Sequence, residues 1–263
     1  MSQHLNQNKK LWDNWTTGHF TSDFYDVQGF LKHRNSLTEQ ELEHMPDLNG
    51  KRVLHLQCHF GQDTLSLATL GARVCGLDLS TVAIEKAREL ATKMEVNAEF
   101  IEHDASQPFA PWAAQFDVVF ASFGVIGWHP SASRWMDAAF SYLKPGGKLV
   151  FLEFHPAIWM LDDDFDQLKY PYLNGDPIVT LEEDSYAAAG AEPTTCTTWN
   201  HGVSDVLAPI LNHPERELIT FKEYDYSPHA FFKNHTEIAP KRYQFKGREG
   251  IMPMTYAVVA RKK

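Results

Sequence analysis

The 263-residue sequence lacks the features that define several protein classes. It has only three cysteines, at positions 58, 75 and 196, and this sparse, odd set favours a reducing compartment over a disulfide framework. No apolar run approaches the roughly 20 residues that cross a bilayer. The polar start, MSQHLNQNKK, lacks the apolar core of a signal peptide. We therefore expect a cytoplasmic protein that does not bind membranes.

Basic residues are also scarce. Lysine and arginine number 24 against 34 acidic residues, the formal net charge is −10, and the basic residues form no stripe. Binding to a nucleic-acid backbone requires concentrated positive charge, so we expect no nucleic-acid partner. The hydrophobic content of 43% suits one large domain, or one domain with an elaboration.

Alternating strands and helices are predicted across the first part of the chain. Strands are expected at 52–57, 72–77, 98–102, 116–122 and 148–154, and helices at 62–70, 81–95 and 133–143. The continuous apolar run FDVVFAS is typical of a strand that is covered on both faces. Such alternation predicts a parallel sheet built from right-handed crossovers. A helix at about 203–212, a strand at 217–225 and a terminal strand follow.

The segments that flank this pattern are irregular. The first fifty residues are rich in aromatic side chains, and a helix is expected from Ser36 because Ser36 and Glu39 have capping-box spacing. Residues 157–199 mix acidic residues, prolines and aromatics without a helical period. We predict an N-terminal aromatic lid at 1–50 and a main domain at 51–263, in which an insertion at about 157–199 forms a cap.

Polar residues follow several of the predicted strands. Ligands of open parallel sheets bind beyond the carboxyl ends of the strands. Asp78 comes 17 residues after Gly61 and suits the hydroxyls of a ribose, with helix capping as the alternative. Asp104 suits an adenine amino group, with a solvated loop position as the alternative. Ser122 and His155 end two further strands.

Cys58 and His59 suggest a metal or nucleophile site. Zinc needs about four ligands at recognisable spacings, which the scattered cysteines and histidines do not provide. Adjacent residues at a strand end point to opposite sides and cannot easily activate each other. We therefore expect no metal, and we interpret Cys58 as a packing residue.

Five motifs in order resemble the class I S-adenosylmethionine-dependent methyltransferases of the bacterial small-molecule type. VLHLQCHFG lies on the pattern V-L-D-L-G-C-G-x-G, GLDLS on the acidic residue after the second strand, and EHDAS on the third motif. FDVVFAS and LKPGGKLVF match the fourth strand and the turn into the fifth. The resemblance spans about residues 50–263. It implies an α/β fold with a seven-stranded, mostly parallel sheet, helices on both faces and an antiparallel last strand.

The resemblance also implies a cofactor and its contacts. The cofactor would be S-adenosylmethionine, and the activity would be in-line methyl transfer to a small-molecule acceptor by a monomer or homodimer. The positions that match the family's cofactor contacts, with two lid aromatics added, are Gln57, Cys58, His59, Gly61, Asp63, Asp78, Leu79, Asp104, Ala105, Ser122, Tyr25 and Trp15.

The first motif departs from the family at three positions. His55 replaces an aspartate, and Gln57 and His59 replace glycines. Gly61 is kept, and the helix N-terminus behind it favours the methionine carboxylate. We expect Asp63 or the Gln57 carbonyl region to hold the amino-acid end of the cofactor; for Asp63, simple complementarity to the helix dipole is the alternative. A dehydrogenase would need G-x-G-x-x-G, which CHFGQD does not supply.

The acceptor side is less defined by motifs. A sulfonium is already a strong electrophile, so the protein mainly aligns the reactants and excludes water. A base is needed only when the acceptor arrives protonated, and His155 is the first candidate, followed by Glu153 and His129. His155-Pro156 and His129-Pro130 are alternatively simple turns. A protein that binds S-adenosylmethionine or S-adenosylhomocysteine without transferring methyl, as a sensor or scaffold, is the second functional hypothesis.

Overall fold

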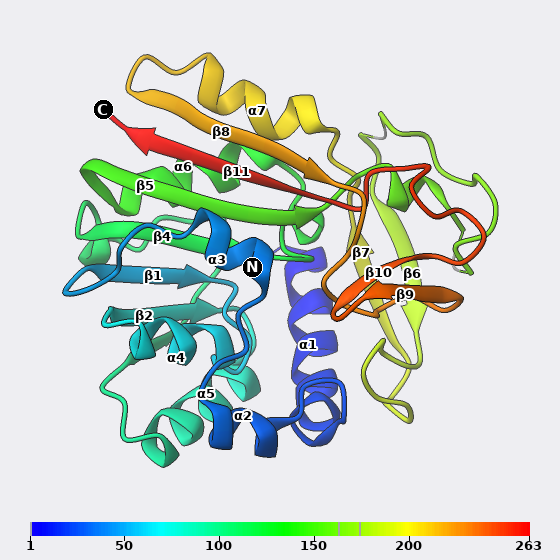
Figure 1. Cartoon of the computed structure of the whole chain (residues 1–263), viewed down its shortest axis with the longest axis horizontal. Helices are drawn as coiled ribbons and strands as arrows, with labels where there is room; N and C mark the ends of the chain where they lie inside the picture. Colours follow the sequence, from blue (N-terminus) through cyan, green and yellow to red (C-terminus); the bar gives the residue numbers. More distant parts are fainter. Residues whose placement is uncertain (1, 163, 174) are drawn as a thin grey trace.

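A seven-stranded sheet forms the centre of the molecule in the computed structural model, which describes residues 2–162, 164–173 and 175–263 (Figure 1). The strand order is β3-β2-β1-β4-β5-β11-β8. The bounds are β1 Arg52–Leu56, β2 Arg73–Asp78, β3 Glu99–Glu102, β4 Phe116–Ser122, β5 Leu143–Phe154, β8 Arg216–Tyr224 and β11 Thr255–Lys262. The first five strands in this order, from β3 through β2, β1 and β4 to β5, pair in parallel. Strand β11 is antiparallel to both β5 and β8. The predicted seven-stranded sheet with an antiparallel last strand is confirmed.

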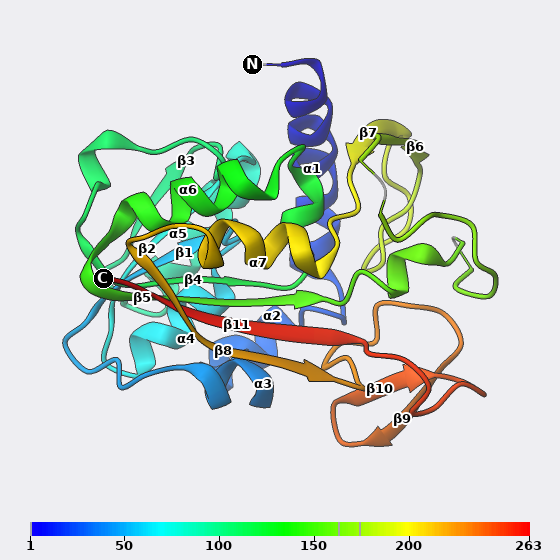
Figure 2. The ribbon, with the colours of Figure 1, turned by 90° about the horizontal axis from the view of Figure 1, so that it is seen from above.

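Helices cover both faces of the sheet because its central strands are apolar on both sides. Val53 packs into one buried cluster and Leu54 into the other. Helices α6 (Ala132–Tyr142) and α7 (Val203–Leu211) lie on one face, and α3 (Glu39–His44) and α4 (Gln62–Thr69) lie on the other (Figure 2). Helix α5 (Thr81–Lys93) packs against α4, β2 and β3. These layers leave the carboxyl ends of the parallel strands free to build a site.

Two hairpins and the first helix lie beyond those carboxyl ends. The arrowheads of β1, β4 and β5 point toward α1 (Gln3–Thr21), and the hairpins lie on its other side (Figure 1). One hairpin, β6 (Ile178–Glu182) with β7 (Thr194–Thr198), comes from the 157–199 segment. The Asn8 side chain joins α1 to β7, donating to the Thr197 carbonyl at 2.8 Å and accepting from its amide at 2.9 Å.

The second hairpin was not predicted from the sequence. It comprises β9 (His235–Ala239) and β10 (Arg242–Phe245), between β8 and β11. Its residues carry no clear apolar alternation. Short 3₁₀ turns complete the fold: η1 Ala110–Trp112, η2 Ile126–Trp128 and η3 Ile158–Met160. Among residues 2–162, 164–173 and 175–263, no helix combines the length and apolarity needed to cross a membrane.

The N-terminal fifty residues depart most from the sequence predictions. They form α1, α2 (Val27–His33) and α3, whereas the sequence suggested a helix from Ser36 only. The capping box belongs to Thr38 and Glu41, two residues later, so the predicted helix start is wrong. The Ser36 hydroxyl instead donates to Asp63 at 2.5 Å. Helix α1 has no clean apolar stripe because its buried face includes Asn8 and other polar side chains.

Candidate active site

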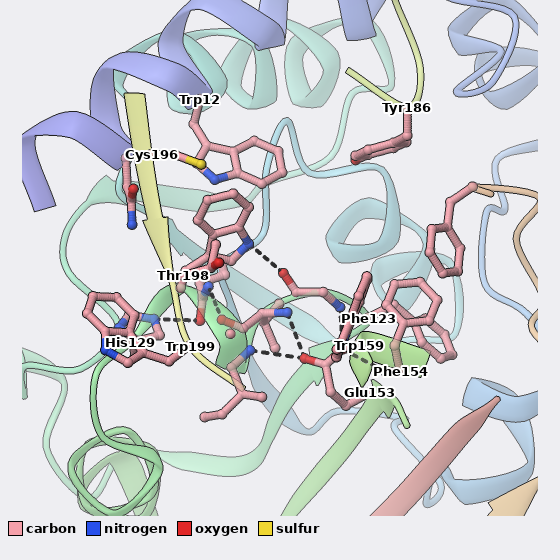
Figure 3. A pocket seen from close by; sticks show the side chains of 18 of the residues that line it. Trp12, Phe123, His129, Glu153, Phe154, Trp159, Tyr186, Cys196, Thr198 and Trp199 are labelled. Atoms are coloured by element: carbon pink, nitrogen blue, oxygen red, sulfur yellow. Dashed lines mark hydrogen bonds between the residues drawn. The ribbon is translucent and has the colours of Figure 1, made fainter. Parts of the chain in front are cut away.

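A cavity of about 490 Å³ lies at the carboxyl ends of the strands, between the sheet, α1, the β6–β7 hairpin and the β8–β9 connection. Trp12 of α1, Cys196 of β7 and Phe154 of β5 are among the side chains drawn around it (Figure 3). Eleven of the predicted cofactor contacts line it: Gln57, Cys58, His59, Asp63, Asp78, Leu79, Asp104, Ala105, Ser122, Tyr25 and Trp15. The sequence-predicted residues therefore meet in one place.

Gly61 is the predicted contact that does not line the cavity. It is the N-cap of α4 with φ at 79°, and a Cβ there would lie 3.0 Å from Phe100 and 3.1 Å from Ala87. Glycine at this position thus allows α4 to approach β3 and α5 closely. Its part in cofactor binding is indirect, through the placement of the helix.

The two replaced glycines of the first motif keep a glycine-like backbone. Gln57 has φ at 53° and His59 at 49°, a conformation that costs a non-glycine residue of order 1 kcal/mol. The Gln57 side chain offsets this cost through three hydrogen bonds. Its Nε2 donates to the Val125 carbonyl at 2.9 Å, and its Oε1 accepts from Trp135 Nε1 at 2.8 Å and His129 Nε2 at 3.1 Å.

Gln57 also sets the tautomer of His129. An amide oxygen only accepts hydrogen bonds, so His129 carries its hydrogen on Nε2 and a lone pair on Nδ1. That Nδ1 lies 3.9 Å from Asp104 Oδ1. Burial lowers the pKa of His129 to about 4, so the ring is neutral at pH 7. The geometry therefore places His129 beside Asp104, closer to the sheet side of the cavity than to the acceptor side.

Asp78 and Asp104 are held by backbone amides at the ends of their strands. Asp78 accepts from the amides of His59 at 2.8 Å and Ser80 at 2.9 Å, and burial raises its pKa to about 6. Asp104 accepts from the amide and hydroxyl of Ser106, both through Oδ1. Fixed carboxylates at two neighbouring strand ends are suited to hydroxyl and amino donors of one ligand.

Asp63 belongs to a pair of buried carboxyls. Its Oδ1 accepts from the Ser36 hydroxyl at 2.5 Å, and burial raises its pKa. Burial and the charge of Asp63 raise the pKa of Glu41 to about 8, so Glu41 is the protonated member at pH 7. Asp63 lines the cavity, and an ammonium group there would relieve the crowding of negative charge.

Glu153 holds the backbone of residues 124–126, which follow β4. Its carboxylate accepts from the amides of Gly124, Val125, Ile126 and Phe154. Burial raises the pKa of Glu153, and these four hydrogen bonds oppose the rise. A carboxylate so fully engaged is a poor proton acceptor, so the geometry argues against the catalytic role predicted for Glu153.

His155 turns away from the cavity that its neighbours line. Its Nε2 lies 2.9 Å from Glu223 on β8, and its Nδ1 accepts from the Ala157 amide at 3.1 Å. Glu153, Phe154 and Pro156 all line the cavity, but His155 does not. This placement argues against its predicted role as the base. Strand alternation would place residue 155 on the same side as Glu153, but β5 ends at Phe154, and the ring instead faces Glu223.

The other half of the cavity is aromatic. The Phe154 ring lies 5.4 Å from Phe123, 4.2 Å from Phe231 and 5.9 Å from Trp159. Among the described residues, no lysine or arginine side chain lines the cavity. An anionic ligand in this half would therefore find no cationic partner, whereas a planar apolar one would find ring faces and edges.

His229 is a site residue that the sequence did not reveal. It lies between β8 and β9, its ring is 5.3 Å from Phe123 at the end of β4, and it lines the cavity. Burial lowers its pKa to about 4, which leaves a neutral imidazole at pH 7. No motif surrounds it in the sequence, so its place in the cavity depends on the β8–β11 connection.

The comparisons with known proteins agree with this geometry. Residues 53–147 match a family model described as a methyltransferase domain. The sheet order agrees with this match. Residues 53–147 belong to a class I methyltransferase domain. The predicted family is confirmed, and its motif loop, Asp78 and Asp104 lie on the cavity.

Curated relatives match about half of the chain. The ubiquinone biosynthesis O-methyltransferases of Erwinia tasmaniensis and Salmonella typhimurium are 28% and 27% identical over 134 residues, which are 49% of this chain and 55% of theirs. The chain thus spans about half the length of the curated relatives it matches. An S-adenosylmethionine dependent methyltransferase from Mesorhizobium loti has a TM-score of 0.58 at 19% identity, over 85% of this chain and 96% of its own.

A longer structural match extends over the hairpins. Magnesium protoporphyrin IX methyltransferase from Synechocystis, solved with bound S-adenosylhomocysteine, has a TM-score of 0.58 at 16% identity. The match covers 99% of this chain and 97% of that one. At such identity it shows a shared fold.

Proposed function

We propose that the protein transfers the methyl group of S-adenosylmethionine to a hydroxyl of a small, uncharged, apolar aromatic molecule. The observation that carries the proposal is the two-part cavity. The residues of the methyltransferase motifs line one part, and aromatic side chains without any lysine or arginine among the described residues line the other. The relatives named as O-methyltransferases support an oxygen acceptor.

The residues of the sheet side fit the proposed cofactor. Asp78 would accept the ribose hydroxyls, Asp104 the adenine amino group, and Asp63 the methionine ammonium. Three buried nitrogens without partners also lie in this region and would suit a polar group of the ligand. When bound, S-adenosylmethionine supplies an electrophilic methyl on a sulfonium, so the chain's own task is to orient and enclose the acceptor.

On the acceptor side we assign one residue that accepts a proton and one residue that holds the neighbouring backbone in place. The neutral His229 imidazole would take the hydroxyl proton of the acceptor beside Phe123. Glu153 holds the 124–126 backbone in place, and the aromatic walls exclude water. We further propose that residues 1–50 act as the lid and that 157–199 act as the acceptor-side cap, since α1 and β7 both line the cavity.

A labelled-donor screen tests the proposed function. The full chain is incubated with S-adenosylmethionine carrying an isotopically labelled methyl group and with pairs of phenols that differ by one carboxylate. Label is expected on the uncharged member of a pair and not on its anionic partner. Absence of label on every uncharged phenol, with bound donor demonstrated, would favour the non-catalytic sensor or scaffold. Transfer to the anionic members would overturn the acceptor class.

A further inference from the structure

Three buried nitrogen atoms without hydrogen-bond partners gather beside the motif loop. They are Trp15 Nε1, His19 Nδ1 and His59 Nδ1, and they are the buried side-chain polar atoms without a partner in the described part of the chain. His19 stacks on Trp15 with ring centroids 5.9 Å apart and meets His59 at 5.2 Å. Trp15 and His59 line the cavity. A buried polar group without a partner costs about 1–3 kcal/mol, so three at one place indicate a binding site for a polar group of a ligand.

The second nitrogen of each imidazole already has a partner. His19 Nε2 lies 2.8 Å from the Ser185 hydroxyl, whose oxygen also accepts from the amides of Ala187 and Ala188. The Thr16 hydroxyl donates to the Trp12 carbonyl at 2.6 Å and accepts from His59 Nε2 at 3.4 Å. The hydrogen of His59 thus lies on Nε2, its Nδ1 can take up a proton, and the Nδ1 atoms of both rings are without a protein partner.

The charges of the cavity indicate which ligand group belongs here. The methionine end of the proposed cofactor has an ammonium and a carboxylate. Asp63 is available to the ammonium, whereas no lysine or arginine among the described lining residues is available to the carboxylate. The indole N–H of Trp15 and a protonated imidazole are donors without a protein partner that suit this carboxylate. The family motif has glycine at position 59, so His59 is a group that this chain adds.

We propose that Trp15, His19 and His59 bind the α-carboxylate of the methyl donor and of its demethylated product, and that one proton enters the histidine pair from solvent on binding. The inference depends on the proposed cofactor. Trp15 donates through its indole N–H, and one imidazole donates through Nδ1 after protonation. The second imidazole stays neutral because two adjacent imidazolium rings would repel each other.

The surroundings of the pair keep it neutral before the ligand binds. Burial lowers the pKa of His19 to about 4 and that of His59 well below its usual value. Tyr25 and Tyr186 face His19, at 5.3 and 5.1 Å between ring centroids, and Tyr25 lies 5.3 Å from His59. Their hydroxyls bond each other at 2.5 Å, and burial raises both pKa values.

Two carboxylates also lie near the histidine pair. Asp78 accepts the backbone amide of His59 and is engaged on that side. Asp63 raises the pKa of Tyr25 through its charge, which places it within electrostatic reach of the pair. Neither forms a hydrogen bond with the Nδ1 atoms, because both of those are without partners. The charge that stabilises an imidazolium therefore arrives with the ligand carboxylate.

Calorimetry in several buffers tests the inference. The full chain is titrated at pH 7.5 with S-adenosylhomocysteine and with its decarboxylated analogue, which keeps the ammonium, in buffers of different ionisation enthalpy. The slope of heat against ionisation enthalpy gives the protons exchanged. We expect the protein to take up more protons on binding S-adenosylhomocysteine than on binding the analogue, by at most one proton. Because both ligands carry the ammonium, proton exchange at Glu41 and Asp63 cancels in the difference.

Two glutamine variants and a control locate the proton. His59→Gln and His19→Gln are each expected to abolish most of the difference in proton uptake and to weaken S-adenosylhomocysteine about tenfold, with little effect on the analogue. His213→Gln, the same change at a histidine outside the cavity, should leave the difference intact. If His19→Gln does not fold, because that ring is fully buried, His59→Gln decides alone.

The outcomes separate this inference from the proposed function. If S-adenosylhomocysteine binds and its proton uptake equals that of the analogue, the carboxylate site is overturned and the cofactor assignment stands. If S-adenosylhomocysteine does not bind at all, the proposed function itself fails and the carboxylate site fails with it.

Discussion

The two parts of the cavity are built in different ways. The cofactor part comes from short loops that directly follow β1, β2 and β3, and its polar groups are held by backbone amides one to two residues away or in the neighbouring loop. Helix α1 borders both parts, and the acceptor part further combines the end of β5, the β6–β7 hairpin and the β8–β9 connection. Its side chains are mostly aromatic, and several contact one another over long separations in sequence.

This difference separates the part of the cavity that the sheet positions from the part that the same fold can vary. A parallel sheet brings the ends of its strands to one edge, so polar residues there are positioned by the same packing that makes the core. Aromatic side chains from segments that are remote in sequence can pack without a fixed strand register. The same fold can therefore enclose different acceptors. Changes in the first part should therefore affect the cofactor, and changes in the second should affect the acceptor.

The largest effect is expected from Asp78→Ala. The change removes two charge-assisted hydrogen bonds within the loop and the proposed ribose acceptor. We expect a loss of about 3 kcal/mol, or a factor of roughly 150 in S-adenosylhomocysteine affinity measured by calorimetry. Trp159→Ala is the matched control from the acceptor part and should bind within about twofold of the wild type. Equal losses in both variants would contradict the division of the cavity.

His229→Ala is expected to act on the rate alone. Removal of a general base costs about a hundredfold in kcat, and S-adenosylhomocysteine affinity should be unchanged because the ring lies beside Phe123 in the acceptor part. His155→Ala is the comparison, since its ring points toward Glu223 and away from the cavity. A wild-type rate for His229→Ala, with a large loss for His155→Ala, would reverse the assignment.

Trp159→Ala should weaken the acceptor without affecting the cofactor. Its indole contacts Phe154 and Phe231. Loss of this aromatic surface is worth about 2 kcal/mol, so the acceptor KM is expected to rise about 30-fold while kcat changes little. Steady-state kinetics with an acceptor found in the labelled-donor screen measures this. An unchanged KM would place the acceptor elsewhere.

The smallest effect concerns pH and acts on Asp78. Burial raises its pKa from the ordinary 3.8 to about 6, so the protonated form predominates below pH 6 and accepts hydrogen bonds poorly. Affinity for S-adenosylhomocysteine should fall about tenfold between pH 7 and pH 5. The stability of the ligand-free protein follows the opposite sign. Because folding raises this pKa, the contribution is fully present below about pH 4 and is lost as pH rises through 6.

That pH effect has a direct control. Asp78→Asn carries no titrating group at this position, so its weaker affinity should vary less between pH 5 and pH 7 than that of the wild type. An equal pH dependence in both proteins would assign the effect to another carboxyl, such as Asp63.

Much of the sheet and of the cofactor part could be predicted from the sequence. The five first strands and the helices between them have strong apolar patterns, and they lie within a few residues of their expected bounds. Asp78 and Asp104 were found because strand ends are visible in such a pattern. The start of α3 was placed wrongly at Ser36 because two serine or threonine residues offer nearly equal capping-box spacing, and only packing against Asp63 separates them.

The sequence by itself determined where the apolar strands and the motif loop lie along the chain, and which acidic residues follow the strands. These features are local and recur at regular spacing. Only the tertiary structure decided that His155 faces Glu223, that His229 enters the cavity, and that His19 meets His59. Those contacts join residues tens to hundreds of positions apart. Their geometry depends on how α1 and the hairpins pack across the edge of the sheet, for which no local pattern exists.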